Sequence, residues 1–217
     1  MDQQDALLEE SLHHMHVIHG CVSINDILLR IGEYDTSHNN EKYNHEERTV
    51  KFVIQHQLFD PRTYEYDLAL IRLSERVEFR RNIVPVCLPK PEHTFIGEEG
   101  TVAGWGRLYE GGPPPSIIHE VKVPVIKNRE CEAMYLRAGY REYIPDIFLC
   151  AGFEKGGKDS CEGDSGGPLV IKKDGRYTIS GIISWGIGCA AKNQPGSCNM
   201  QLIFDHFQVL EIRFESV

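Results

Sequence analysis

Residues 163–179 read GDSGGPLVIKKDGRYTI, in which a glycine-rich turn around Ser165 leads directly into apolar residues. The apolar run at residues 169–171 is typical of a strand, and the Asp174-Gly175 pair favours a tight turn into a second strand. The sequence therefore predicts a β-hairpin immediately after the serine.

The same turn matches the bare pattern G-x-S-x-G, in which α/β-hydrolases hold a nucleophilic serine between a strand and a helix. The predicted hairpin argues against this interpretation, because no helix follows Ser165. Glycines still suit a nucleophile turn, since their backbone freedom lets successive N–H groups point at one oxyanion. A turn that merely contains a serine is the alternative.

Short apolar or alternating runs, separated by Gly, Pro, Asn and Asp, extend over most of the chain. Such spacing is typical of an all-β sandwich or barrel. The runs cover residues 27–31, 49–54, 68–73, 101–103, 121–126, 169–171 and 177–183.

The two ends of the chain have a helical pattern instead. Residues 1–20 predict an amphipathic helix, because Leu8, Leu12 and Met15 fall at helical spacing. The apolar residues of the segment 203–214 share one helix face and predict a C-terminal helix.

Composition excludes several classes of protein. The 217 residues carry 23 Lys and Arg against 32 Asp and Glu, a net charge of −9, with no long basic run. Nucleic-acid binding begins with clustered positive charge, so we expect no nucleic-acid partner. The longest apolar runs are far shorter than the roughly 20 residues of a membrane-spanning helix, so we expect no membrane span.

The seven cysteines lack the tight Cys-x-x-Cys spacing of zinc ribbons and favour disulfides in an oxidising compartment. An odd number leaves at least one of them unpaired within the chain. We therefore expect an extracellular protein, although no signal peptide is visible at the amino terminus.

A nucleophilic serine needs a histidine to take its proton, and a buried carboxylate holds that histidine. Asp67 is the best carboxylate candidate, because it opens the apolar run DLALIRL, residues 67–73, whose composition indicates burial. A turn residue that caps a strand is the alternative for Asp67.

Four motifs together resemble the trypsin-like serine proteases, in their order and spacing as well as in their residues. They are DLALI at 67–71, AGWG at 103–106, DSCEGDSGGP at 159–168 and SWG at 184–186. The resemblance runs from about Leu28 to Gly196. It implies an all-β fold of two antiparallel six-stranded β-barrels, here with the first barrel incomplete, and a C-terminal helix.

The resemblance also implies the roles of site residues. Ser165 is the nucleophile, Asp67 orients the histidine, and the backbone N–H groups of Gly163 and Ser165 form the oxyanion hole. The catalytic histidine is assigned to His19, although the family places this histidine directly before a cysteine and here Gly20 separates His19 from the cysteine.

The specificity pocket is assigned in the same way. Asp159 stands six residues before the serine, where a carboxylate selects a substrate Arg or Lys by charge pairing. Gly186 and Gly196 match wall positions that must stay small. The other implied substrate-binding residues are Ser184 and Trp185.

The resemblance pairs the cysteines as well. It implies the disulfides Cys131–Cys150 and Cys161–Cys189. A third family bridge is absent, with Gly100 and Ile171 at its two positions. Cys87 resembles the position that holds an upstream regulatory chain in multidomain members.

Both ends of the chain depart from the family. Active members begin with a cleaved Ile-Val-Gly-Gly terminus whose ammonium group pairs with the acid before the serine, here Asp164, and this segment is missing. We therefore expect Asp164 to lack a cationic partner and the serine loop to be zymogen-like. The chain divides into a non-family segment 1–20, a partial protease domain 21–198 and a divergent tail 199–217.

Two clusters could hold a metal, but we expect no metal and no cofactor. The histidines within residues 13–19 form a metal-binding tract or a solvated set. Some family members bind calcium in the loop that holds Glu33, Glu41, Glu46 and Glu47 here, and a solvated acidic loop is the alternative.

The sequence thus predicts a serine endopeptidase that cleaves protein or peptide substrates after Arg or Lys through an acyl-enzyme. The alternative is a catalytically inactive homologue that binds protein partners.

Overall fold

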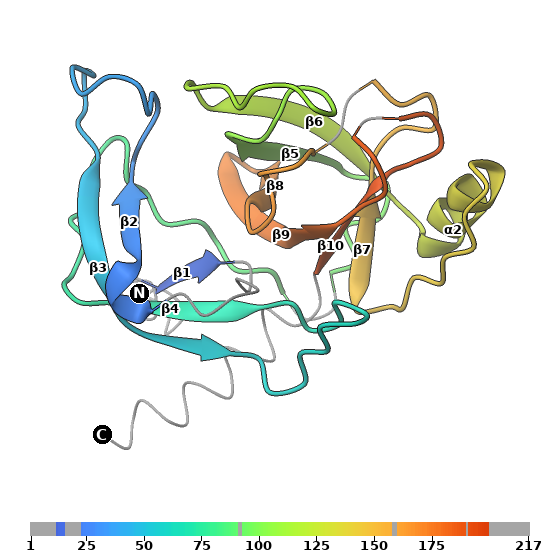
Figure 1. Ribbon diagram of the computed structural model, residues 1–217, viewed down its shortest axis with the longest axis horizontal. Coiled ribbons are helices and arrows are strands. Elements are labelled where there is room, and N and C mark those ends of the chain that lie inside the picture. Colours follow the sequence, from blue (N-terminus) through green and yellow to red (C-terminus); the bar gives the residue numbers. More distant parts are fainter. Residues whose placement is uncertain (1–11, 16–22, 91–92, 158–159, 190, 200–217) are drawn as a thin grey trace.

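A computed structural model describes residues 12–15, 23–90, 93–157, 160–189 and 191–199. This part of the chain forms an open sheet and a closed barrel, which lie beside each other in Figure 1. The predicted all-β, two-lobed fold is confirmed. Among the described residues, no helix is both long and apolar enough to cross a membrane.

The first lobe is a four-stranded antiparallel sheet of order β1-β4-β3-β2. Its strands are β1 (Leu12–Met15), β2 (Leu28–Ile31), β3 (Glu46–Gln55) and β4 (Ala69–Leu73), with a short 3-10 helix η2 (Ile24–Asp26) before β2. Its core consists of Ile31, Val50, Ile71, Leu73, Val77 and Ile83. Within the described residues this lobe is an open sheet, as predicted for an incomplete first barrel.

The predicted helix over residues 1–20 is wrong at Leu12–Met15, which form strand β1. This strand pairs with β4, with Leu12 opposite Arg72 and Met15 opposite Ala69. Pairing with β1 gives hydrogen-bond partners to the backbone groups along one edge of β4. A helix at residues 12–15 would leave these groups of β4 without such partners. The rest of this prediction, and the predicted C-terminal helix, lie outside the described residues.

The second lobe is a closed barrel of order β10-β7-β6-β5-β8-β9. Its strands are β5 (Glu99–Gly104), β6 (His119–Ile126), β7 (Phe148–Ala151), β8 (Pro168–Lys173), β9 (Arg176–Trp185) and β10 (Gly196–Asn199). Helix α2 (Asn128–Arg137) connects β6 to β7 and buries Cys131, Met134 and Tyr135. The barrel core includes Val102, Val123, Leu149, Leu169 and Ile183.

The predicted hairpin after the serine is confirmed as β8 and β9. Asp174 and Gly175 connect them with φ angles of 51° and 80°, which a type I′ turn requires at both central residues. The turn matches the right-handed twist of the strands, so the Asp-Gly pair fixes their register.

Strand β9 also joins the two lobes. Its Ile183 lies in the barrel core, whereas Ile179 and Ile182 belong to a second cluster with Leu68 and Leu70 of the first lobe. Because both faces of β9 pack against apolar residues, the site between the lobes rests on a common buried strand.

Candidate active site

The serine turn, residues 161–167, is held from both of its ends. The disulfide Cys161–Cys189 fixes its start, and its last residues bond to β9, with Gly166 N–H donating to Ile183 O at 2.8 Å and Ile183 N–H to Gly167 O at 2.9 Å. Ser165 is exposed between these anchors. The turn therefore presents a hydroxyl to solvent on a fixed backbone.

The amides of Gly163 and Ser165, predicted as an oxyanion hole, bracket Asp164. Gly163 has a φ of 97°, a conformation that favours glycine. Within the described residues, neither N–H has a hydrogen-bond acceptor. Both donors are thus available to a bound group.

Asp164 lies in a tight cradle formed by β5 and the residues after it. Its carboxylate accepts hydrogen bonds from Gly106 N–H at 2.8 Å and Cys161 N–H at 2.9 Å. A Cβ atom on Gly104 or Gly106 would come within 2.2 or 2.3 Å of the Asp164 side chain, so only glycine fits at these positions. Among the described residues, the groups that bond to the Asp164 carboxylate are these backbone N–H donors, and the expected lack of a cationic partner stays a prediction.

Asp67 is fully buried, with an exposed fraction of 0%. Ser184 of β9 donates its hydroxyl to Asp67 Oδ2 at 2.8 Å. The structure therefore brings together two of the predicted site residues, one from each lobe. A buried carboxylate at this point is costly unless such donors surround it.

The predicted substrate-binding residues at the ends of β9 and β10 also lie together. A Cβ atom on Gly186 would be 3.6 Å from the Cα of Gly196, so the two glycines face each other closely. Trp185 packs between Phe148, edge to face with ring centroids 5.7 Å apart, and Tyr135, stacked at 6.2 Å. These rings fix the indole beside the glycine pair.

Two predicted site residues, His19 and Asp159, lie outside the described residues, so their positions relative to Ser165 and Gly186 stay predictions. His13 and His14 of the histidine tract are on β1, opposite Ile71 and Leu70. Among the residues that the structure describes, no group of three or more His, Cys, Asp or Glu side chains could hold a metal ion.

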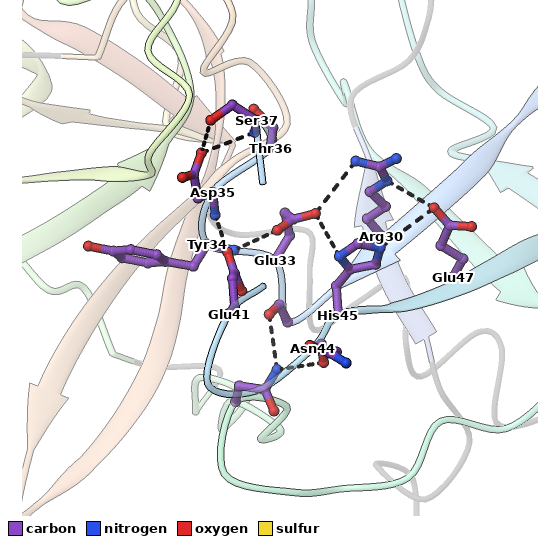
Figure 2. Close-up of polar contacts among 12 residues, drawn as sticks. Arg30, Glu33, Tyr34, Asp35, Thr36, Ser37, Glu41, Asn44, His45 and Glu47 are labelled. Atoms are coloured by element: carbon purple, nitrogen blue, oxygen red, sulfur yellow. Dashed lines mark hydrogen bonds and ion pairs between the residues drawn. The ribbon is translucent and has the colours of Figure 1, made fainter. Parts of the chain in front are cut away.

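The acidic loop after β2 has basic neighbours within the protein. Glu33, whose side chain is 3% exposed, contacts His45 Nδ1 at 2.9 Å and Arg30 at 3.6 Å, and Arg30 reaches Glu47 at 3.0 Å (Figure 2). Arg30 and His45 are therefore the basic neighbours of the most buried carboxylate in this loop.

The same loop is braced at Asp35. Hydrogen bonds from Ser37 and then from His38 hold the pKa of Asp35 well below its usual range. Its own N–H donates to the Glu41 carboxylate (Figure 2). The acids of this loop therefore act as internal acceptors that stiffen the backbone.

Both predicted disulfides, Cys131–Cys150 and Cys161–Cys189, are present. Cys87 has a free, half-buried thiol, and its backbone bonds to Tyr177 O and Ile179 N of β9 at 2.9 and 3.0 Å.

Sequence reasoning missed several residues around the serine turn. Trp105 and Gly106 were identified only as members of the AGWG motif, and the motif did not predict which residues they contact. Thr36 and Ser116, from two separate loops, carried no signal in the sequence.

Comparison with known proteins agrees with this arrangement. The family described as Trypsin matches residues 15–200. The chain is 53% identical over 176 residues to serine proteinase stubble of Drosophila melanogaster, which covers 81% of this chain and 22% of that protein. It is 49% identical over 167 residues to serine protease filzig of the same organism, covering 76% of this chain and 10% of filzig.

A shorter relative is matched over most of its length. Trypsin-1 of Astacus astacus is 40% identical over 183 residues, which cover 83% of this chain and 74% of that protein. The chain thus spans about a fifth of stubble and a tenth of filzig, but three quarters of a trypsin.

Proposed function

Because the chain belongs to the trypsin family of serine proteases, we propose that it is an endopeptidase that hydrolyses peptide bonds through an acyl-enzyme at Ser165. The observation that carries this proposal is the family match together with the exposed Ser165 beside two backbone N–H groups that have no acceptor among the described residues.

In the proposed reaction, Ser165 Oγ attacks the substrate carbonyl carbon while the imidazole of His19 takes the hydroxyl proton. The N–H groups of Gly163 and Ser165 stabilise the oxyanion that forms. The C–N bond then breaks, the imidazolium gives its proton to the leaving amine, and water hydrolyses the acyl-enzyme by the same steps. Asp67 orients the histidine, a role that its complete burial and its bond to Ser184 support.

We assign specificity for Arg or Lys to Asp159, whose carboxylate would pair with the substrate cation. Gly186 and Gly196 support this assignment, because neither carries a side chain that would narrow the proposed pocket.

The setting of the domain is proposed from its cysteines. Two disulfides favour an extracellular location. The free, half-buried thiol of Cys87 is the proposed attachment point of an upstream regulatory chain.

A second candidate function is favoured by Asp164, which has backbone donors and no cationic partner among the described residues. A chain with Asp164 in this state would be an inactive homologue that binds proteins with the surface of its lobes.

Labelling with a fluorophosphonate separates the two candidates. The oxidised, folded chain is expected to be labelled once, on Ser165, and the Ser165→Ala variant not at all. A surface variant of the first lobe, Ser74→Ala, is the matched control and should be labelled at the wild-type rate. Absence of labelling in the folded wild-type chain would favour the binding function.

Specificity is tested with a pair of ester substrates that differ only in an arginyl or phenylalanyl acyl group. The arginyl ester should be hydrolysed faster, and Asp159→Ser should remove that preference while fluorophosphonate labelling continues. An unchanged preference in Asp159→Ser would contradict the assignment of the pocket.

A further inference from the structure

Loops from the two lobes meet at one carbonyl group, that of Ser116, which we call the joint. Thr36 donates to this oxygen from its N–H at 2.9 Å and from its hydroxyl at 3.2 Å, and Trp105 Nε1 donates at 3.1 Å. Beside the joint, Ile118 N–H donates to Tyr34 O at 3.0 Å. The loop 33–45 of the first lobe is thus bonded to the loop 105–118 of the second.

Trp105 begins a short segment, residues 105–107, that lies directly against the serine turn. Gly106 N–H donates to the Asp164 carboxylate at 2.8 Å, and Arg107 N–H donates to Glu162 O at 2.9 Å. A Cβ atom on Gly163 would be only 3.2 Å from Gly106 Cα. The segment 105–107 therefore acts as a template for the backbone that precedes Ser165.

The loop 33–45, on the first-lobe side of the joint, is held by polar contacts within itself, so a displacement of this loop reaches the joint. Its two ends are tied by the contact of Glu33 with His45, and the bond from Asp35 N–H to Glu41 crosses its middle (Figure 2). A chain of bonded groups therefore runs from this loop through the joint to Asp164.

We propose that Thr36 and Trp105 are positioning residues, which couple the loop 33–45 through the Ser116 carbonyl to the serine turn and set the geometry of Ser165 and its oxyanion donors. This inference rests on the proposed function, because the reaction affected is acylation of Ser165. Small displacements of a nucleophile and its oxyanion donors lower the rate of acyl transfer steeply, so a distant bond can influence it.

The test uses variants that each remove one side-chain donor, and of these Thr36→Val also keeps the side-chain volume. Trp105→Phe removes the indole N–H, and Thr36→Val removes the hydroxyl, while Thr36→Ser keeps it. The matched control is Thr49→Val, which removes a hydroxyl bond of 2.7 Å to Ser74 within the first lobe, away from the joint.

Two readouts are compared for every variant of the full chain. The first is deuterium uptake by the peptides that cover residues 104–107 and 160–167, which requires no activity. The second is the rate of fluorophosphonate labelling of Ser165. Loss of one hydrogen bond at the joint should raise uptake in both peptides and slow labelling, each about fivefold in Trp105→Phe.

Thr36→Val should change both readouts about threefold, and Thr36→Ser should restore wild-type values. The double variant should fall short of the product of the two single effects, because both donors share one acceptor. Thr49→Val should leave both peptides unchanged.

Two results would overturn the inference: unchanged uptake at residues 160–167 in Trp105→Phe, or equal effects of Thr36→Ser and Thr36→Val. If the wild-type chain is not labelled but uptake changes as expected, the proposed function fails while the coupling stands.

Discussion

Asp60 accepts three hydrogen bonds from a single residue, Arg62, and these bonds determine the pKa of its carboxyl group. The backbone N–H, Nε and a terminal guanidinium nitrogen of Arg62 lie 2.9, 3.1 and 2.7 Å from the carboxylate oxygens. The side-chain bonds to Arg62, followed by the backbone bond, lower the pKa of Asp60 to about 2.

A depressed pKa stabilises the folded chain only while the carboxylate is charged. The contribution of Asp60 should therefore be complete above about pH 4, the usual value for Asp, and be lost as the pH falls towards 2. The carboxyl carbon of Asp60, followed by NMR, should titrate near pH 2 in the wild type and nearer 4 in Arg62→Ala. Equal midpoints in the two proteins would show that Arg62 has no such effect.

Single residues were predictable from sequence where side-chain type carries the chemistry. Ser165 stands in a glycine-rich turn, and Asp67 opens an apolar strand, so both could be selected in advance. The partners of Asp164 could not, because Gly106 and Cys161 donate backbone N–H groups, which every residue type except proline possesses. The division of the chain at residues 21 and 198 stays a prediction.

At the scale of elements, hydrophobic periodicity predicted strands that have one buried and one exposed face. It missed elements that are determined by tertiary contacts. β3 alternates between buried or half-buried and exposed residues along its length and was expected. Helix α2 was missed, although its buried residues Cys131, Met134 and Tyr135 fall at helical spacing and could have indicated it. β1 was predicted as a helix because pairing with β4 leaves no local signal in the sequence.

The barrel offers a place for an additional disulfide between two of its strands. Thr101 of β5 pairs with Val170 of β8, so Gly100 lies opposite Ile171 one step along the ladder. Antiparallel partners have Cα separations within the range that a disulfide spans. A Cβ on Gly100 would be 2.6 Å from Leu169 Cδ1, a flexible methyl end that can shift.

We therefore expect the variant Gly100→Cys with Ile171→Cys to oxidise spontaneously. The bridge should raise the free energy of unfolding by about 2–4 kcal/mol over that of Gly100→Cys alone, measured for both proteins by urea denaturation without reductant, so that the native disulfides Cys131–Cys150 and Cys161–Cys189 stay intact. Thiol titration of the double variant should find two fewer free thiols than a reduced engineered pair would give. A double variant that stays reduced in oxidising buffer would show that the strands cannot approach closely enough.

At the scale of the whole molecule, the described parts of the two lobes are joined by apolar packing and by polar bonds at separate points. Leu68 and Leu70 pack against Ile179 and Ile182, and the backbone of Cys87 bonds to β9. The sequence predicted two lobes only through the family resemblance. The apolar composition of β9 predicts that the strand is buried. It does not distinguish a strand that is buried only inside a barrel from one whose second face packs against another lobe.

The bond from Ser184 to Asp67 is buried and crosses from one lobe to the other, so it should contribute more to stability than a similar bond within one lobe. Ser180 is its matched control, because it is also buried on the same strand and donates to Leu169 O at 2.9 Å inside the barrel. Ser184→Ala removes a donor to a buried carboxylate and should lower the free energy of unfolding by about 2–3 kcal/mol, whereas Ser180→Ala should cost about 1 kcal/mol. Urea denaturation followed by tryptophan fluorescence measures both. Equal losses would mean that the carboxylate is solvated as well without Ser184, and that this bond stabilises the protein no more than a bond within one lobe.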